Sequence, residues 1–379
     1  MPVRTDLLVI GAGPYAYATA AYAGHRGVDT HVVGLPMAAW RDHMPADMYL
    51  RSGPDWHLDA TGEHTFAAYF EDRGLDPAAH DPIPLDVFLD HTDWFAEHKG
   101  LRPDERLVDS LRPSSGGPGF VASMADGTTI EADRVVAAPG VGYFAQLPDW
   151  HEQVPAEHRS HTSELVAFDD LAGARVAVIG GRQSAYEWAA LLCDHGAARV
   201  DVVHRHDTPD FAKVSWGFVD EYVEQTLVHR GWWRQLPAAD QAAVARRFWE
   251  VGRLTLEHWL VPRLAPDVVH RHPRTEVDSV TTQGPAVVLG LSDGSTLEVD
   301  HVVFACGYRA DLSQVPYLSG VLDRVSVTDG FPDLSEGFET SLPGLYVLGF
   351  AATRDFGPFY GFTKGCPSAA RIVVDEMLR

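Results

Sequence analysis

The strand, glycine turn and helix at the start of the chain constrain the fold more than any other feature. The sequence "DLLVIGAGPYAYATAAYAGHRGVDTHVVG" predicts a strand over 6–10, a turn over 11–14, a helix over 14–25 and a second strand over 29–33. The first strand is a continuous apolar run, which is typical of a parallel sheet buried on both faces. Gly11, Gly13 and Ala16 match G-x-G-x-x-A at the junction of strand and helix. In this context the pattern predicts a Rossmann-like unit whose helix N-terminus binds the pyrophosphate of a dinucleotide.

Residues 175–205 repeat this architecture. The segment "RVAVIG" predicts a strand, "SAYEWAALLCDHG" a helix and "RVDVVHR" another strand. Gly180 and Gly181 form the turn, and Ala185 supplies the small third position. Two such units in one chain imply two bound dinucleotides.

Arg182 stands where the second unit would carry its middle glycine. If the Arg182 side chain points at the pyrophosphate, it would clash with it. If it points along the cleft, its guanidinium can bind a phosphate bidentately. His204 and Arg205 follow the second strand, where NADPH-binding units place a cation for the 2′-phosphate. We therefore favour a retained but modified NADPH site. The alternative is that Arg182 lies on the surface after a degenerate turn.

A second repeat indicates the domain organisation. The segments "GFVASMADGTTIEADRVVAAPG" and "AVVLGLSDGSTLEVDHVVFACGY" each read as a hairpin followed by a buried strand that ends at a glycine. The tryptophan-rich segment 215–265 reads as helices that cover a sheet or, alternatively, form a substrate lid. We expect an α/β fold with two Rossmann-like, three-layer dinucleotide-binding domains. The expected limits are an FAD domain over 1–155 and 311–379, and an inserted NADPH domain over 160–310 that contains the helical excursion 215–265.

Charge and cysteine content exclude several classes of function. A net charge of −23 argues against a nucleic-acid partner, which demands a basic surface. No apolar run approaches the ~20 residues that span a membrane, and the first apolar run is a buried strand, so a cytoplasmic protein is expected. The 3 cysteines are far apart without a CxxC, which disfavours a dithiol redox centre and a zinc site. The 19 histidines show no HExxH spacing, so no metal is expected.

The two dinucleotide units, "FACGY" and the closing "GLYVLGF" together resemble the two-domain flavoprotein monooxygenases over essentially the whole chain. This superfamily includes flavin-containing and N-hydroxylating monooxygenases, which use FAD with NADPH. The segments "GGRQSAYEWAALL", "MYLRSGPDWHLD" and "FGPFYGFTKGC" are most similar to a bacterial subgroup that includes FAD-dependent urate hydroxylases. "DHVVFACGY" matches the D-x-x-x-F-A-T-G-Y motif of N-hydroxylating enzymes except that Cys306 replaces threonine. The long F-x-G fingerprint of flavin-containing monooxygenases is not legible, and Gly34 stands where an acidic residue usually binds the ribose.

The resemblance implies the site residues. The N-terminal unit, the segment 40–59 and "YVLGF" are expected at FAD, with the helix from about Gly365 directed at the flavin ring, and the second unit is expected at NADPH. The expected cofactor contacts are Gly11, Gly13, Pro14, Ala16, Trp40, Met48, Arg51, Ser52, Gly140, Gly180, Gly181, Arg182, Gln183, Ser184, His204, Arg205, Cys306, Gly307, Tyr308, Gly349 and Phe350. Candidates for holding or protonating the oxygenating species are Arg51, His57 and Lys364.

The implied function is an FAD-dependent, NAD(P)H-consuming monooxygenase. Such an enzyme would hydroxylate a small nitrogen-containing molecule, an amine or a purine such as urate, with O2 through a C4a-hydroperoxyflavin. One alternative is a flavin-dependent reductase or dehydrogenase with an acceptor other than oxygen. Another is a degenerate dinucleotide-binding protein, of which Gly34 and Arg182 would be the signs.

Overall fold

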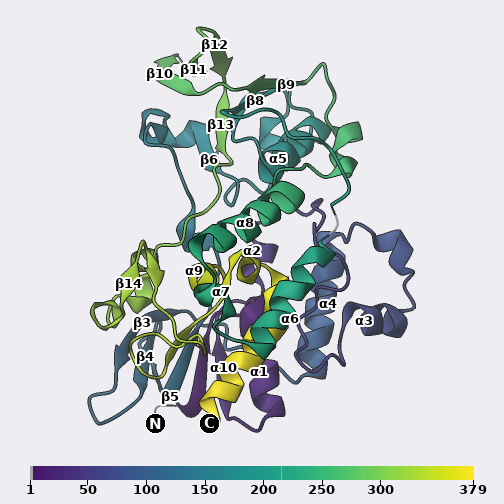
Figure 1. The fold of residues 1–379 in the computed structure, drawn as a ribbon. Coiled ribbons are helices and arrows are strands. Elements are labelled where there is room, and N and C mark those ends of the chain that lie inside the picture. The colour runs from purple at the N-terminus through teal and green to yellow at the C-terminus, as the bar shows by residue number, and fades with distance from the viewer. Residues whose placement is uncertain (1–2, 215, 285) are drawn as a thin grey trace.

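Two sheets, each built around one of the predicted units, organise the chain (Figure 1). The computed structural model describes residues 3–214, 216–284 and 286–379. The first sheet is six-stranded and contains β1 (Val3–Ile10), β2 (Thr30–Val33), β3 (Val108–Pro113), β4 (Phe120–Met124), β5 (Thr129–Ala137) and β16 (Leu345–Val347). Its order is β2-β1-β5-β4-β3, with β16 also paired to β5. Three strands, β1, β2 and β16, run parallel to their partners, and β3, β4 and β5 form an antiparallel meander.

The second sheet is inserted in the chain between β5 and β16. It is five-stranded and contains β6 (Arg159–His161), β7 (Arg175–Ile179), β8 (Arg199–His204), β9 (Val269–Pro273) and β13 (His301–Phe304). All of its strand pairs are parallel, in the order β6-β13-β7-β8-β9. The predicted α/β fold with two Rossmann-like units, one inserted in the other, is therefore confirmed. The domain limits given above stay a prediction.

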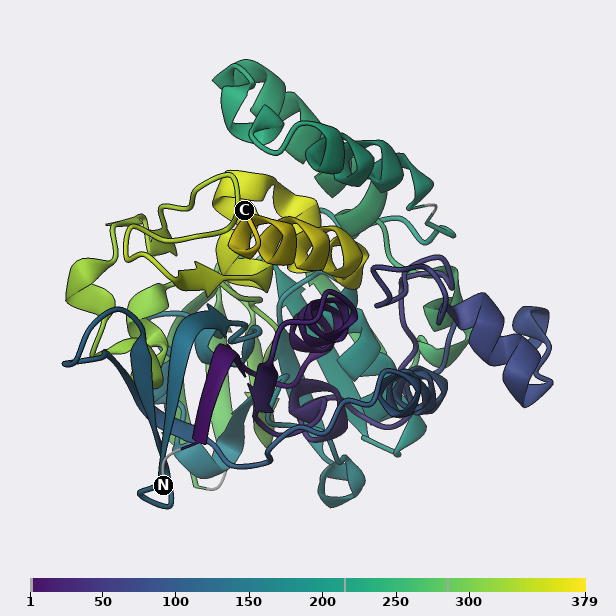
Figure 2. The same ribbon diagram turned by 90° about the horizontal axis from the view of Figure 1, so that it is seen from below.

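Each unit has the predicted strand, turn and helix. The helix α1 (Pro14–His25) follows β1, and α5 (Gln183–Asp194) follows β7. In β1 the side chains of Leu7, Leu8 and Val9 are all fully buried, as expected for a strand covered on both faces. The helix α1 packs against α10 (Cys366–Met377), and Figure 2 shows these two helices side by side beside the first sheet. The last segment of the chain thus completes the first unit.

The predicted hairpin repeat is also present. The strands β4 and β5 form the first copy, and β11 (Ala286–Leu291), β12 (Thr296–Val299) and β13 form the second. A small sheet holds β10 (Val277–Gln283) with β11 and β12, and β14 (Val327–Thr328) pairs β15 (Phe331–Pro332). In each copy the last strand lies beside the first strand of its unit, and it ends next to that unit's glycine turn.

The insertion 215–265, whose first residue lies outside the described residues, is largely helical. It contains α6 (Asp220–Val228), α7 (Trp232–Gln235), α8 (Ala238–Phe248) and a π-helical turn over Trp249–Arg253. In Figure 1 these helices lie across the front of the molecule, between the two sheets. The rings of Tyr222 and Trp232 stack on Phe359, with centroids 5.3 and 6.1 Å away, so much of the aromatic content serves packing. Within the described ranges, no helix is long and apolar enough to cross a membrane.

Four further helices were not predicted: α2 (Ala38–Arg41), α3 (Phe66–Arg73), α4 (Leu85–His98) and α9 (Thr353–Phe356). The helix α4 buries Phe88, His91 and Phe95 on one face, and the ring of Phe66 from α3 stacks on His91 at 3.8 Å. The helix α4 contacts both α2 and α3, and the backbone N–H at its first residue, Leu85, donates to the carbonyl of Met48 in the segment 40–59.

Two segments that connect the sheets run beside each other. The backbone N–H of Gln146 donates to the carbonyl of Gly307 at 2.8 Å, and that of Arg309 donates to Phe144 at 2.9 Å. Ala145 and Tyr308 form an antiparallel bridge between them. We call these two segments, 138–146 and 305–310, the paired linkers.

Candidate active site

One cavity of about 710 Å³ extends from the glycine turn before α1 to Arg182, at the end of the glycine turn before α5. Its walls come from the N-terminal turn, the segment 37–56, the region 107–109, the first linker, the helix α5, the insertion and the C-terminal segment 348–363. Of the expected contacts, those that line it are Gly11, Gly13, Pro14, Trp40, Met48, Arg51, Ser52, Gly140, Arg182, Gln183, Ser184, Gly349 and Phe350. Sequence segments more than 300 residues apart thus share one space.

The N-terminal turn has the backbone geometry that a pyrophosphate needs. Gly11 has a φ of 115°, and a Cβ atom placed on it would lie 2.5 Å from the carbonyl oxygen of Ala138. A Cβ on Gly13 would meet no atom within 4 Å, so this residue borders open space. No side chain caps α1, whose first-turn N–H groups are therefore available to a ligand. These residues fit FAD, whose phosphates such a turn can bind through backbone donors.

The second turn has the same construction. Gly180 has a φ of 143°, and a Cβ on it would collide with the carbonyl oxygen of Ala305, the counterpart of Ala138. Arg182 is the N-cap residue of α5, and no side chain caps this helix. Gly181 packs against the ring of His204, so only glycine fits there. Neither Gly180 nor Gly181 lines the cavity, and both act by shaping the turn.

Arg182 faces the cavity without a protein partner. Among the described residues, no hydrogen bond or ion pair engages its guanidinium, and burial together with the nearby Arg205 lowers its pKa. Arg205 is exposed and likewise unpaired in the described part of the chain. His204 differs, because it is buried and its ring contacts the Tyr186 hydroxyl at 3.1 Å and the His206 carbonyl at 2.8 Å. Arg182 therefore lines the cavity, Arg205 is exposed outside its lining, and His204 belongs to the core.

Arg51 lines the cavity, but its guanidinium is fully engaged. It donates to the Glu257 carboxylate at 2.9 Å and to the carbonyls of Gly252 and Thr255 at 2.7 and 3.2 Å. Its guanidinium also lies 5.5 Å from the ring centroid of Trp216. Arg51 consequently connects the segment 40–59 to residues 252–257 at the end of the insertion.

His57 and Lys364 lie at a different, smaller cavity of about 160 Å³. The Lys364 ammonium contacts Asp220 of α6 at 2.6 Å and Asp55 at 3.4 Å. The His57 ring accepts from the backbone N–H of Asp59 at 3.2 Å, and burial lowers its pKa. The structure does not bring the three candidate catalytic side chains together.

Four further expected contacts, Ala16, Cys306, Gly307 and Tyr308, do not line the large cavity. Ala16 is fully buried beneath the N-terminal turn. The Cys306 thiol donates to the carbonyl of Ile179 at 3.4 Å, and burial raises its pKa to about 11. Gly307 and Tyr308 belong to the paired linkers, which agrees with a role in connecting the domains.

Glu187 is a buried carboxyl in the cavity wall that the sequence did not reveal. It is 1% exposed and accepts from the Gln183 side chain at 2.7 Å, while Oε1 has no hydrogen-bond partner among the described residues. Burial raises its pKa to about 7, against the opposing effect of Gln183 and Arg263. Gln183 in turn accepts from the backbone N–H of Glu257 at 3.0 Å, so this chain of contacts joins α5 to the insertion.

Two more charged residues of the cavity wall were missed, Asp109 and Arg253. Asp109 is exposed and lines the same cavity as Gly34, whose φ is 137° and whose absent Cβ would approach the Gly11 backbone to 3.2 Å. An acidic residue is thus excluded at Gly34, and Asp109 supplies a carboxylate at the same cavity. No local pattern marks Asp109, because it comes from β3, about 75 residues further along the chain.

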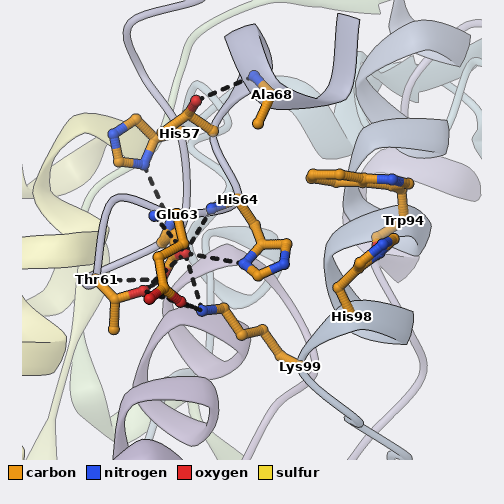
Figure 3. A network of polar contacts seen from close by, with 10 residues as sticks. His57, Thr61, Glu63, His64, Ala68, Trp94, His98 and Lys99 are labelled. Atoms are coloured by element: carbon orange, nitrogen blue, oxygen red, sulfur yellow. Dashed lines mark hydrogen bonds and ion pairs between the residues drawn. The ribbon is translucent and has the colours of Figure 1, made fainter. Parts of the chain in front are cut away.

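A compact polar cluster lies outside the cavity, around Asp59 (Figure 3). Ligand atoms of Asp59, Glu63 and His64 lie within 4.8 Å of one another, as in a possible metal site. The Lys99 ammonium contacts Asp59 at 3.0 Å and Glu63 at 3.3 Å, so this ammonium group occupies the place that a metal ion would take. Burial raises the Asp59 pKa, but backbone donors from His64 and Thr61 and the Lys99 ammonium bring it well below its usual value. The cluster stabilises a loop.

Comparison with known proteins decides the family. The sequence profile described as pyridine nucleotide-disulphide oxidoreductase matches residues 5–231, a stretch that contains both glycine turns. The chain belongs to this family. Pyridine nucleotide-disulphide oxidoreductases bind FAD and NAD(P)H, so the expected cofactors and the assignment as a flavin-dependent oxidoreductase are confirmed.

Individual relatives agree with this family. An FAD-dependent urate hydroxylase of Xanthomonas campestris pv. campestris is 25% identical over 83% of this chain and 72% of its own length. A ferredoxin–NADP reductase of Salinispora tropica is 27% identical over 91% of this chain and 85% of its own length. The ornithine N-hydroxylase of Kutzneria sp. 744, solved with reduced FAD, NADP+ and L-ornithine, superposes with a TM-score of 0.83 at 16% identity, covering 100% and 99% of the two chains. The predicted resemblance to two-domain flavoprotein monooxygenases is confirmed, and this last likeness establishes the fold.

Proposed function

We propose that this oxidoreductase is an FAD-dependent monooxygenase that consumes NADPH and hydroxylates a small nitrogen-containing molecule, an amine or a purine such as urate. The observation that carries the proposal is the single cavity that reaches both glycine turns. A hydride donor bound at one turn and a flavin bound at the other would share this space. The urate hydroxylase relative supports an oxygenation reaction.

FAD held in this site would supply the oxygen-activating chemistry, with NADPH as the reductant and O2 as the source of the oxygen atom. The residues of the chain would bind and orient the cofactors and the substrate, and they would exclude water from the site. Gly11, Gly13 and the first turn of α1 would bind the FAD pyrophosphate, with Asp109 toward the ribose hydroxyls. Arg182 and the first turn of α5 would bind the NADPH pyrophosphate.

Arg205 supports NADPH over NADH, because an unpaired guanidinium after β8 suits a 2′-phosphate. Arg51 acts as a positioning residue. By holding Gly252, Thr255 and Glu257 it keeps the insertion closed over the cavity and limits the entry of water.

The test begins with anaerobic addition of NADPH to FAD-loaded protein. Bleaching of the visible flavin bands is expected, and product carrying 18O from 18O2 is expected when urate or a primary amine is present. NADPH oxidation that no substrate accelerates would contradict the proposal. If the flavin stays oxidised, the second turn does not serve a hydride donor.

A second candidate is a flavin-dependent reductase with an acceptor other than oxygen. Ferredoxin–NADP reductases among the relatives favour it, including one that aligns with 91% of this chain. Rapid transfer of electrons from NADPH to ferredoxin, with no oxygenated product, would identify this activity. A degenerate dinucleotide-binding protein would show neither reaction.

A further inference from the structure

Arg253 is an unpaired, half-buried arginine in the wall of the large cavity. Among the described residues, no hydrogen bond or ion pair engages its guanidinium. It ends the π-helical turn that follows α8, and such turns within helices occur frequently at functional sites. The adjacent carbonyl of Gly252 accepts from Arg51 at 2.7 Å, so the backbone that carries Arg253 is held in place.

Aromatic rings surround this guanidinium. Its central carbon lies 4.8 Å from the ring centroid of Trp249 and 5.6 Å from that of Phe362. Trp56 and Trp216 line the same cavity, and Trp216 lies 5.9 Å from Phe362. Arg253 therefore projects into a largely apolar pocket.

Two of the three arginines that line the cavity have no ion-pair partner among the described residues, although the carboxyls of Glu187 and Asp109 also line it. Arg51 is paired with Glu257, but Arg182 and Arg253 have no acidic partner in the described residues. Burial, with the like charges of Arg51 and Arg182, lowers the Arg253 pKa to about 10, so the group stays charged at neutral pH. A buried charge without a counter-charge is unfavourable, and a bound anion would relieve it.

Arg253 belongs to a different element from the two glycine turns. Gly13 and Arg182 are the N-cap residues of the helices α1 and α5, whereas Arg253 comes from the insertion and its guanidinium faces Phe362. The like charge of Arg182 acts on Arg253, so the two guanidinium groups lie in the same part of the cavity. Arg253 therefore adds a second positive charge beside the turn of α5, on the wall that the insertion supplies.

We propose that Arg253 binds an anionic group of the substrate, a carboxylate or a deprotonated ring, and so selects small anionic molecules for this site. This inference rests on the proposed function, since it assigns the anion at Arg253 to the molecule that is oxygenated. The aromatic walls would favour a flat ring next to the charge.

The test uses benzoate and benzamide, which have similar shapes and different charges. Each is titrated into FAD-loaded protein, and binding is read from the visible difference spectrum of the flavin. The wild type should bind benzoate at least about tenfold more tightly than benzamide, the size expected for one charge-assisted hydrogen bond. Arg253→Gln should lose this preference, and Arg253→Lys should keep part of it. Arg246→Gln, which removes an exposed arginine of α8, is the matched control.

Equal binding of the two probes by the wild type, no binding of benzoate, or benzoate affinity unchanged in Arg253→Gln would overturn the proposal. Loss of NADP+ affinity with unchanged benzoate affinity would assign Arg253 to the dinucleotide and also overturn it. Flavin bleaching by NADPH without substrate is measured on the same variants. It tests the proposed function separately, because it does not depend on the substrate anion.

Discussion

The buried carboxyl of Glu187 makes a strong prediction about stability and pH. Its pKa rises from 4.5 to about 7 on folding, chiefly because burial disfavours the charged form. The folded state therefore holds the proton more tightly than the unfolded state. The stability this provides is complete below pH 4.5 and is lost as the pH rises through 7.

The magnitude follows from the difference of about 2.5 pKa units, at about 1.36 kcal/mol for each unit. The full effect is about 3 kcal/mol, and about 2–3 kcal/mol of it falls between pH 5 and pH 8. Glu187→Gln keeps the shape and an acceptor for Gln183 but cannot ionise. Relative to the wild type, this variant should become more stable by that amount as the pH is raised from 5 to 8.

The assay is unfolding by heat and by urea at pH 5, 6, 7 and 8, followed by circular dichroism. Comparing the variant with the wild type cancels the titration of all other groups. Glu250→Gln, which removes an exposed carboxylate of the insertion, should follow the wild type at every pH. If the stability curves of Glu187→Gln and the wild type run parallel, the carboxyl is not protonated on folding and the reasoning fails.

Three further predictions concern the turns and the loop. Gly11→Ala should abolish FAD retention, because its Cβ would lie 2.5 Å from the Ala138 carbonyl, and the absorbance ratio at 450 and 280 nm of purified protein measures this. Lys99→Met should lower the free energy of unfolding by about 3–5 kcal/mol by leaving the buried Asp59 carboxylate without its cation, and chemical denaturation checks it. Arg182→Gly should weaken NADP+ binding about tenfold, as expected for one lost charge-assisted contact, whereas unchanged affinity in calorimetry would show that this arginine does not reach the phosphates.

Local patterns predicted the central elements well. The helix expected over 14–25 has those bounds, and the turn at Gly180 has the geometry of the turn at Gly11. In these segments, residues that are neighbours in sequence are also in contact, so a glycine and an apolar run suffice to define the structure. The helices α3 and α4 were missed because their signal is an apolar face that becomes informative only once the packing partner is known.

The candidate site was harder to predict because its side chains come from distant segments. His57 and Lys364 are sequence neighbours of residues that line the large cavity, yet both lie at another one, since adjacent residues point in different directions. His204 follows its strand as a phosphate ligand should, but its ring turns inward to the Tyr186 hydroxyl. Glu187 and Arg253 become recognisable only when burial and missing partners can be seen.

The paired linkers have a mechanical consequence. Because hydrogen bonds join Gln146 to Gly307 and Arg309 to Phe144, the two connections between the sheets are tied to each other along this stretch. Each linker starts at the alanine whose carbonyl touches a turn glycine, Ala138 at one turn and Ala305 at the other. The bridge therefore connects the backbone beside one glycine turn to the backbone beside the other. A change in the path of either linker would strain the hydrogen bonds that it shares with the other.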